Sequence, residues 1–146
     1  MSLRLWQEIQ AMLRQTDLKA IQVVALVLEN HQGEVLIQKR REGTHLAGLW
    51  EFPGGKVEVN ETLSEALTRE IQEELNYTPE NPKHLITLLH HYPEKSIELI
   101  VYHQQANNPI VTDAENQPLH WVKKQQLHLL EMPAADRPII KLLNNN

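Results

Sequence analysis

The chain has no cysteine, no apolar run long enough to span a bilayer and no excess of basic residues. Without cysteine, the protein has neither disulfides nor a thiol nucleophile, which fits a cytoplasmic location. The lack of a long apolar run and of a signal-peptide pattern predicts no membrane association. A formal net charge of −5, with 14 basic against 19 acidic residues, argues against a nucleic-acid polymer as partner.

What is present predicts one compact domain. A chain of 146 residues can bury roughly two thirds of its unfolded surface. From residue 20 onward, apolar segments suited to strands alternate with segments of helical periodicity. We expect strands at 20–30, 34–40, 84–92, 97–105 and 118–122, and helices from Leu63, at 123–130 and at 135–143. Such alternation predicts an α/β (α+β) fold in which a mixed sheet lies between helices.

Residues 1–18 precede this pattern and are predicted to form a helical appendage to a domain at 19–146. Within residues 2–16, apolar side chains recur at helical spacing, namely Leu5, Trp6, Ile9, Met12 and Leu13. Three interpretations fit this stripe. It docks on the domain, it forms a weak homodimer of an otherwise monomeric protein, or it is the remnant of an upstream domain in a longer chain.

Residues 55–77, GKVEVNETLSEALTREIQEELNY, form the most informative segment. Thr62 followed by Glu65 is the signature of a capping box, which predicts a helix beginning at Leu63. An apolar stripe follows at every fourth residue, made of Leu67, Ile71 and Leu75. Asn76 comes next and suits the left-handed conformation that ends many helices.

The side of this helix next to the stripe carries Glu70, Glu73 and Glu74. Like charges at this spacing destabilise a helix, so their presence needs a reason. One interpretation is a solvated acidic face, the usual meaning of a glutamate-rich helix. The other is a site for Mg²⁺ or Mn²⁺, hard cations that prefer oxygen ligands and that bridge carboxylates to substrate phosphates.

The residues around the helix favour the metal site. Gly55, then Glu61 after five residues, then Arg69-Glu70-Ile71-Gln72-Glu73-Glu74 after seven more, resemble the signature of MutT-like Nudix hydrolases. Two positions depart from it, because Asn76 replaces a glycine and Tyr77 fills the last apolar slot. Asparagine tolerates a positive φ better than most residues, so the helix end is preserved. We call this signature segment, residues 55–77, the box. The resemblance covers residues 20–143 and includes Glu51-Phe52-Pro53-Gly54-Gly55-Lys56 at the entry to the box.

This resemblance implies the Nudix α/β/α sandwich and a role in cleaning the nucleotide pool, a form of DNA repair. It implies Mg²⁺-dependent hydrolysis of a nucleoside triphosphate to the monophosphate and pyrophosphate, with Mn²⁺ as substitute. The implied metal ligands are the carbonyl of Gly54 and the side chains of Glu70, Glu73, Glu74 and Glu115. The same four glutamates are the implied catalytic residues, together with Arg69, which orients a box glutamate.

The resemblance also implies that Arg40 contacts the nucleotide, with Lys39 and Arg41 as further candidates for phosphate contact. Taken without the box, a basic triplet at a strand end is more often a solvated edge. Phe52 is a candidate for the substrate pocket and is equally suited to the core.

Base preference depends on Asp136. MutT enzymes that act on oxidised guanine nucleotides have an asparagine here, whose amide can donate to O6 and accept from N7. An ionised carboxylate only accepts, which suits the exocyclic amine of cytosine, and CTP pyrophosphohydrolases resemble the chain at this point. Hydrolysis of 8-oxo-dGTP is the main expectation, and CTP or 5-methyl-dCTP is the alternative. Asp136 as a plain helix cap is a third interpretation.

An alternative from another class is a Nudix-fold regulator that binds a nucleotide without cleaving it. The presence of every box carboxylate argues against this alternative. A histidine metal site is also disfavoured, because the spacing of His84, His90, His91 and His103 matches no zinc pattern.

Overall fold

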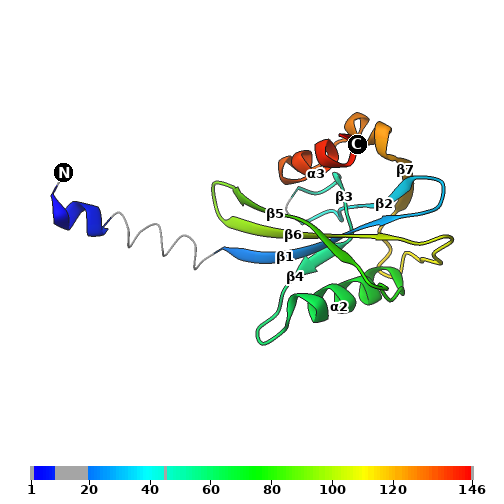
Figure 1. Cartoon of the computed structure of the whole chain (residues 1–146), viewed down its shortest axis with the longest axis horizontal. Coiled ribbons are helices and arrows are strands. Elements are labelled where there is room, and N and C mark those ends of the chain that lie inside the picture. Colours follow the sequence, from blue (N-terminus) through cyan, green and yellow to red (C-terminus); the bar gives the residue numbers. More distant parts are fainter. Residues whose placement is uncertain (1, 9–19, 45, 146) are drawn as a thin grey trace.

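The computed structural model of the chain describes residues 2–8, 20–44 and 46–145. In this part of the chain, seven strands form one sheet in the order β3-β2-β1-β6-β5, with β4 paired to β1 and β7 to β2 (Figure 1). The strands are β1 (Ile21–Glu29), β2 (Glu34–Lys39), β3 (Trp50–Glu51), β4 (Gly54–Lys56), β5 (Lys83–His91), β6 (Ser96–Gln105) and β7 (Leu119–Lys123). β1 and β6 are parallel and the other pairs are antiparallel, so the predicted mixed sheet is confirmed.

The apolar run of β1 is explained by layers on both faces of the sheet. Alternate side chains of a strand point to opposite faces, and both sets are buried here. Val24, Leu26 and Leu28 pack in the cluster that contains the box helix, whereas Ala25 and Val27 pack in the cluster that contains the C-terminal segments. The helices α2 (Leu63–Leu75) and α3 (Arg137–Leu143) accordingly lie on opposite faces of the sheet (Figure 1).

The box helix α2 spans Leu63–Leu75, and its local signals are confirmed. The side chain of Thr62 accepts from the Glu65 N–H, and the Glu65 side chain accepts from the Thr62 N–H. Asn76 ends the helix at φ 50° and ψ 42°, with its N–H donating to the Gln72 carbonyl. Asparagine therefore does at this position what glycine does in the family signature. The predicted stripe of α2 is buried against the sheet.

The C-terminal layer differs from the prediction in helix type. Instead of a helix at 123–130, the structure has a 3₁₀ helix at Lys124–Leu129, in which Leu127 is the buried residue. Residues 135–143 divide into a 3₁₀ turn at Ala134–Asp136 and the helix α3 at Arg137–Leu143. Pro138 lies in the first turn of α3, where its missing N–H costs no helical hydrogen bond.

Two short strands, β3 and β4, occupy a stretch for which no strand was predicted from the sequence. β4 pairs with β1, with Ala25 opposite Gly54. A Cβ on Gly54 would overlap the carbonyl of Val24, so glycine permits this close approach. The pairing fixes the segment before the box directly beside α2.

Residues 3–8 are helical, and residues 9–16 of the predicted helix lie outside the described residues. Leu3, Leu5 and Trp6 of this segment are exposed. Among the helices of the described ranges, none combines the length and the hydropathy that crossing a bilayer requires.

Candidate functional site

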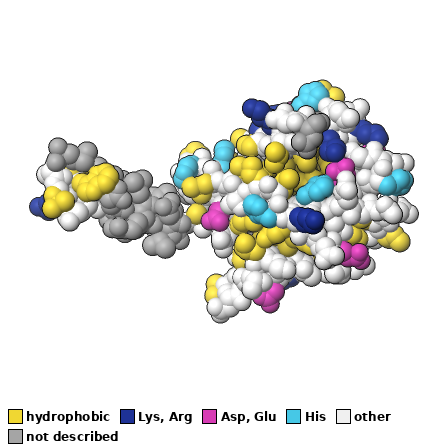
Figure 2. Space-filling view, in the orientation of Figure 1, with side chains coloured by type: hydrophobic (Ala, Val, Ile, Leu, Met, Phe, Trp, Pro, Cys, Tyr) yellow, Lys and Arg dark blue, Asp and Glu magenta, His cyan; other side chains and the backbone are white. Residues whose placement is uncertain are grey.

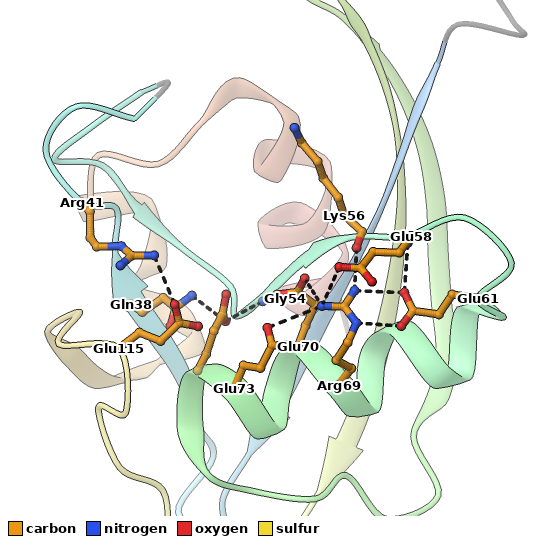
Figure 3. Close-up of polar contacts among 11 residues, drawn as sticks. Gln38, Arg41, Gly54, Lys56, Glu58, Glu61, Arg69, Glu70, Glu73 and Glu115 are labelled. Atoms are coloured by element: carbon orange, nitrogen blue, oxygen red, sulfur yellow. Dashed lines mark hydrogen bonds and ion pairs between the residues drawn. The ribbon is translucent and has the colours of Figure 1, made fainter.

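Arg69 ties the start of the box to the helix (Figure 3). Its Nε and Nη2 donate to the two carboxylate oxygens of Glu61 at 2.6 and 2.9 Å, and Nη2 also donates to the Lys56 carbonyl at 3.0 Å. The hydrogen bonds from Arg69 and from the Glu58 N–H lower the pKa of Glu61 to about 2. Glu61 therefore serves as the anchor of Arg69, which leaves the Nη1 of Arg69 directed at the next glutamates.

Glu70 lies where the backbone before the box passes α2. Arg69 Nη1 donates to its Oε1 at 2.9 Å, and a Cβ on Gly55 would overlap the Glu70 carboxylate. Burial raises the pKa of Glu70, and Arg69 partly offsets this effect. Glu73 lies one helical turn after Arg69, with its Oε2 at 3.4 Å from Arg69 Nη1, and about half of its side chain is exposed.

Glu74 is the most buried carboxylate of the box, with 8% of its surface exposed. Its Oε2 accepts hydrogen bonds from the Gly54 N–H at 3.0 Å and from Gln38 Nε2 at 2.8 Å. Burial raises the pKa of Glu74 to about 8, and the charges of Glu51 and Glu70 add to the increase. Burying a charged carboxylate to this extent lowers the stability of the fold, so its presence points to a function.

Glu115 reaches the box from the connection between β6 and β7. Arg41 Nη2 donates to its Oε2 at 3.2 Å, and Figure 3 shows Arg41 and Glu115 facing each other from different parts of the chain. The charge of Glu115 contributes to the raised pKa of Glu70. The structure thus brings Glu115 to the carboxylates of α2.

The chemistry of this donor set fits a hard divalent cation, because it consists of carboxylate oxygens that come from two segments of the chain. Within the described ranges, no three acidic or histidine side chains converge as a ready-made metal cage. These glutamates instead accept hydrogen bonds from different donors of the protein. Arg69 donates to Glu70, and Gln38 donates to Glu74. Histidines lie at separate places on the face seen in Figure 2.

A cavity of about 300 Å³ adjoins these carboxylates. Its polar wall combines the cations Arg40, Arg41 and Lys95 with the acids Glu51, Glu74 and Asp136, and its apolar wall includes Phe52 and Leu99. The Arg40 guanidinium forms an ion pair with Glu51. Gly55 and Glu74 of the box line the cavity together with the adjacent Gly54, so the box and the cavity form one continuous site.

Asp136 is buried in the wall of this cavity, with 7% of its surface exposed. Asp136 lies at the N-cap position of α3, as the capping interpretation predicts, but its side chain makes no capping hydrogen bond, so capping does not account for the carboxyl. Burial raises the pKa of Asp136 to about 7, the charge of Glu51 adds to this, and Arg40 opposes it. The sequence analysis treated this carboxyl as ionised, because burial beside a second acid is not visible in the sequence.

The remaining predicted residues lie in different surroundings. Phe52 is 4% exposed, and it belongs both to the core and to the cavity wall. Lys39 is absent from the described cavity lining, and its Nζ lies 6.0 Å from the centre of the Trp50 ring.

Sequence reasoning missed several polar residues of the site. Tyr92 and Lys95 reach the cavity from the β5–β6 turn, where the Tyr92 N–H donates to the Lys95 carbonyl at 2.8 Å. The two strands that flank this turn were predicted, but the position of the turn at the cavity depends on the order of the strands in the sheet. Gln38 was also missed, although a signal exists, because it directly follows the apolar run Val35–Ile37 in β2.

Comparison with known proteins agrees with this geometry. Residues 24–142 match the family model of the NUDIX domain. The 8-oxo-dGTP diphosphatase of Escherichia coli K12 is 31% identical over 126 residues, which cover 86% of this chain and 98% of that protein. The CTP pyrophosphohydrolase of the same organism is 31% identical over 124 residues, or 85% and 91% of the two chains.

A solved MutT structure from work on Aliivibrio salmonicida and Vibrio cholerae superposes with a TM-score of 0.73 at 30% identity, covering 86% of this chain and 97% of that one. Fold, box geometry and sequence similarity therefore agree. The chain belongs to the Nudix hydrolase family, as the spacing of its box residues predicts.

Proposed function

We propose that the protein hydrolyses a modified nucleoside triphosphate to the monophosphate and pyrophosphate, with 8-oxo-dGTP as the main substrate. The observation that carries this proposal is the continuity of the box carboxylates with a 300 Å³ cavity that has cationic and apolar walls. Similarity to 8-oxo-dGTP diphosphatases of bacteria supports it. A regulator that only binds nucleotides would have no use for a carboxylate buried as deeply as Glu74.

Mg²⁺, or Mn²⁺ in its place, would be held by Glu70, Glu73, Glu74, Glu115 and the carbonyl of Gly54. When bound, such an ion neutralises the charge of the polyphosphate and lowers the pKa of a coordinated water. Arg69 orients the Glu70 carboxylate through its hydrogen bond at 2.9 Å. Arg40 and Arg41 would orient the anionic nucleotide, since phosphoryl transfer depends mainly on positioning and charge.

Asp136 supports both substrate classes. With a pKa of about 7, its carboxyl is present in both protonation states near neutral pH. The protonated form has an O–H donor for O6 of a guanine-type base and an oxygen that accepts, which resembles an asparagine amide. The ionised form accepts from the exocyclic amine of cytosine. CTP or 5-methyl-dCTP therefore remains the second candidate, in agreement with the similarity to a CTP pyrophosphohydrolase.

A nucleotide panel tests the proposal directly. We expect Mg²⁺-dependent pyrophosphate release from 8-oxo-dGTP with a higher kcat/KM than from CTP, 5-methyl-dCTP or dGTP. The measurement is a coupled pyrophosphate assay at pH 7, with EDTA as the metal-free control. A higher kcat/KM for the cytosine nucleotides would favour the second candidate. Tight binding of a nucleotide without cleavage would instead identify a regulator.

We further propose that residues 1–18 are an appendage outside the catalytic machinery. None of the described residues 2–8 lines the cavity, and Leu5 and Trp6 are exposed. Removing residues 1–18 is expected to leave kcat/KM unchanged. A lower Tm would support docking on the domain, and a change in mass by light scattering would support a dimer contact. A fall in kcat with unchanged Tm and mass would contradict the proposal. The cytoplasmic location remains a prediction.

A further inference from the structure

Gln38 occupies an unusual position for an amide. It belongs to β2, follows the buried apolar residues Val35–Ile37, and is itself only 1% exposed. Polar side chains in such places normally have all their hydrogen bonds satisfied. Its Nε2 donates to Glu74 Oε2 at 2.8 Å. Gln38 also lies directly opposite Glu51 in the β2–β3 pair, so the two side chains are neighbours on one face of the sheet, and the Gln38 side chain acts to lower the pKa of Glu51.

The two carboxylates next to this amide belong to different parts of the site. Glu74 lies on α2 and is bound to the Gly54 N–H at 3.0 Å. Glu51 forms the cavity wall, where it pairs with Arg40 and where its charge acts on Asp136. A primary amide nitrogen carries two N–H groups, so it can serve two acceptors at once. Gln38 is thus bonded to the carboxylate of the box and adjacent to the carboxylate of the cavity wall, which lies near the proposed nucleobase contact Asp136.

The carbonyl oxygen of the Gln38 side chain differs from its amide nitrogen in having no hydrogen-bond partner among the described residues. This oxygen, Oε1, is buried. An unpaired buried acceptor destabilises a fold, and methionine would fill similar space without it. Packing alone therefore does not account for glutamine at this position. Departures of this kind from the rules of folding concentrate at functional sites.

We propose that Gln38 is a positioning residue that fixes Glu74 relative to Glu51 and thereby couples the seating of the base to hydrolysis. This inference rests on the proposed function. A residue that acted only on the cavity would change KM and base discrimination, and one that acted only on the box would change kcat. Gln38 changes both, because its amide is bonded to Glu74 and lies beside Glu51.

The experiment compares Gln38→Met with the matched control Gln104→Met. Gln104 is also buried, lies in β6, and uses its amide to bind the Tyr77 hydroxyl and the Glu80 N–H, away from the cavity. For Gln38→Met we expect kcat to fall roughly 10- to 100-fold, as for other groups that orient metal ligands. We also expect a changed ratio of kcat/KM between 8-oxo-dGTP and CTP. Gln104→Met is expected to lower Tm without changing either kinetic quantity.

A second readout does not depend on turnover. Mn²⁺ affinity, measured by electron paramagnetic resonance in the absence of nucleotide, is expected to fall in Gln38→Met and to stay at the parent value in Gln104→Met. If the parent protein hydrolysed no nucleotide, the proposed function would fail, and this titration would still test Gln38. Unchanged kcat together with unchanged Mn²⁺ affinity in Gln38→Met would overturn the inference alone.

Two further variants guard against a purely structural explanation. If Gln38→Met does not fold, Gln38→Asn replaces it, because the shorter amide cannot reach both carboxylates and should show the same kinetic losses. In a double-mutant cycle, Glu51→Gln should change base discrimination less in the Gln38→Met background than in the parent, since the connection is already broken. Additive effects in this cycle would contradict the coupling.

Discussion

Replacing Glu74 by glutamine is expected to lower kcat by roughly three orders of magnitude, since a catalytic metal supplies several kcal/mol of transition-state stabilisation. The amide keeps the size of the side chain and can still bond to Gln38 and to the Gly54 N–H. It cannot supply the negative charge that holds a divalent cation. The measurement is the steady-state rate with Mg²⁺, and Glu80→Gln, at an exposed residue, is the matched control.

The same substitution is expected to stabilise the fold at alkaline pH. The pKa of Glu74 rises from 4.5 to about 8 in the folded protein, so the folded state holds its proton when the unfolded chain has lost it. The parent therefore loses stability as the pH rises from about 4.5 to 8. Glutamine has no such dependence, so the variant gains on the parent across this range, by on the order of a few kcal/mol.

Chemical denaturation in EDTA between pH 5 and 9 measures this gain. A loss of activity together with a gain of stability identifies a functional carboxylate. Replacing a structural carboxylate would lower both the activity and the stability of the protein. A variant that keeps kcat within tenfold of the parent would remove Glu74 from the catalytic machinery.

Replacing Asp136 by asparagine is expected to change the choice of base. The ratio of kcat/KM for 8-oxo-dGTP over CTP should rise by roughly tenfold or more at pH 8 to 9, since a bidentate base contact is worth about 1–3 kcal/mol of discrimination. In the parent, the same ratio should fall as the pH rises through about 7, because the carboxyl then loses the proton that it would donate to O6. The variant should show no such fall.

The stability of Asp136→Asn gives an independent check. Burial raises the pKa of Asp136 from 3.8 to about 7, which corresponds to at most about 4 kcal/mol of stability that the parent loses between these pH values. The asparagine variant should therefore match the parent near pH 4 and exceed it above pH 7. Asp113→Asn, at an exposed position, should show neither effect. A constant substrate ratio over the whole pH range would refute the role of Asp136 in the pocket.

The features that could be predicted from the sequence are those that depend on interactions between residues close together in the chain. The capping box at Thr62, the helix end at Asn76 and the spacing of the glutamates depend on neighbours within a few residues, and all are visible in the sequence. The strands β3 and β4 were missed because they exist through pairing with β2 and β1. Their short segments have no periodicity of their own.

Properties that depend on contacts between distant residues were out of reach in the same way. The sequence identifies Asp136 as a polar residue before a proline-containing helix, but its pKa depends on burial beside Glu51. Arg41 and Glu115 are both conspicuous charged residues, yet only the folded chain places them 3.2 Å apart. Gln38 is polar within an apolar strand, and its proposed role can be inferred only when its contact with Glu74 and its position opposite Glu51 are known.

The parallel pairing of β1 with β6 has a consequence for biosynthesis. Residues 21–29 acquire this neighbour only when residues 97–105 have left the ribosome, which happens after the box helix has left it. Pairing across so long a stretch of chain is slow, because the closure entropy must be met before the contacts form. Until then the apolar stripe of α2 has an incomplete surface to cover it. We therefore expect nascent chains that stop before β6 to depend on chaperones and to lack any catalytic competence.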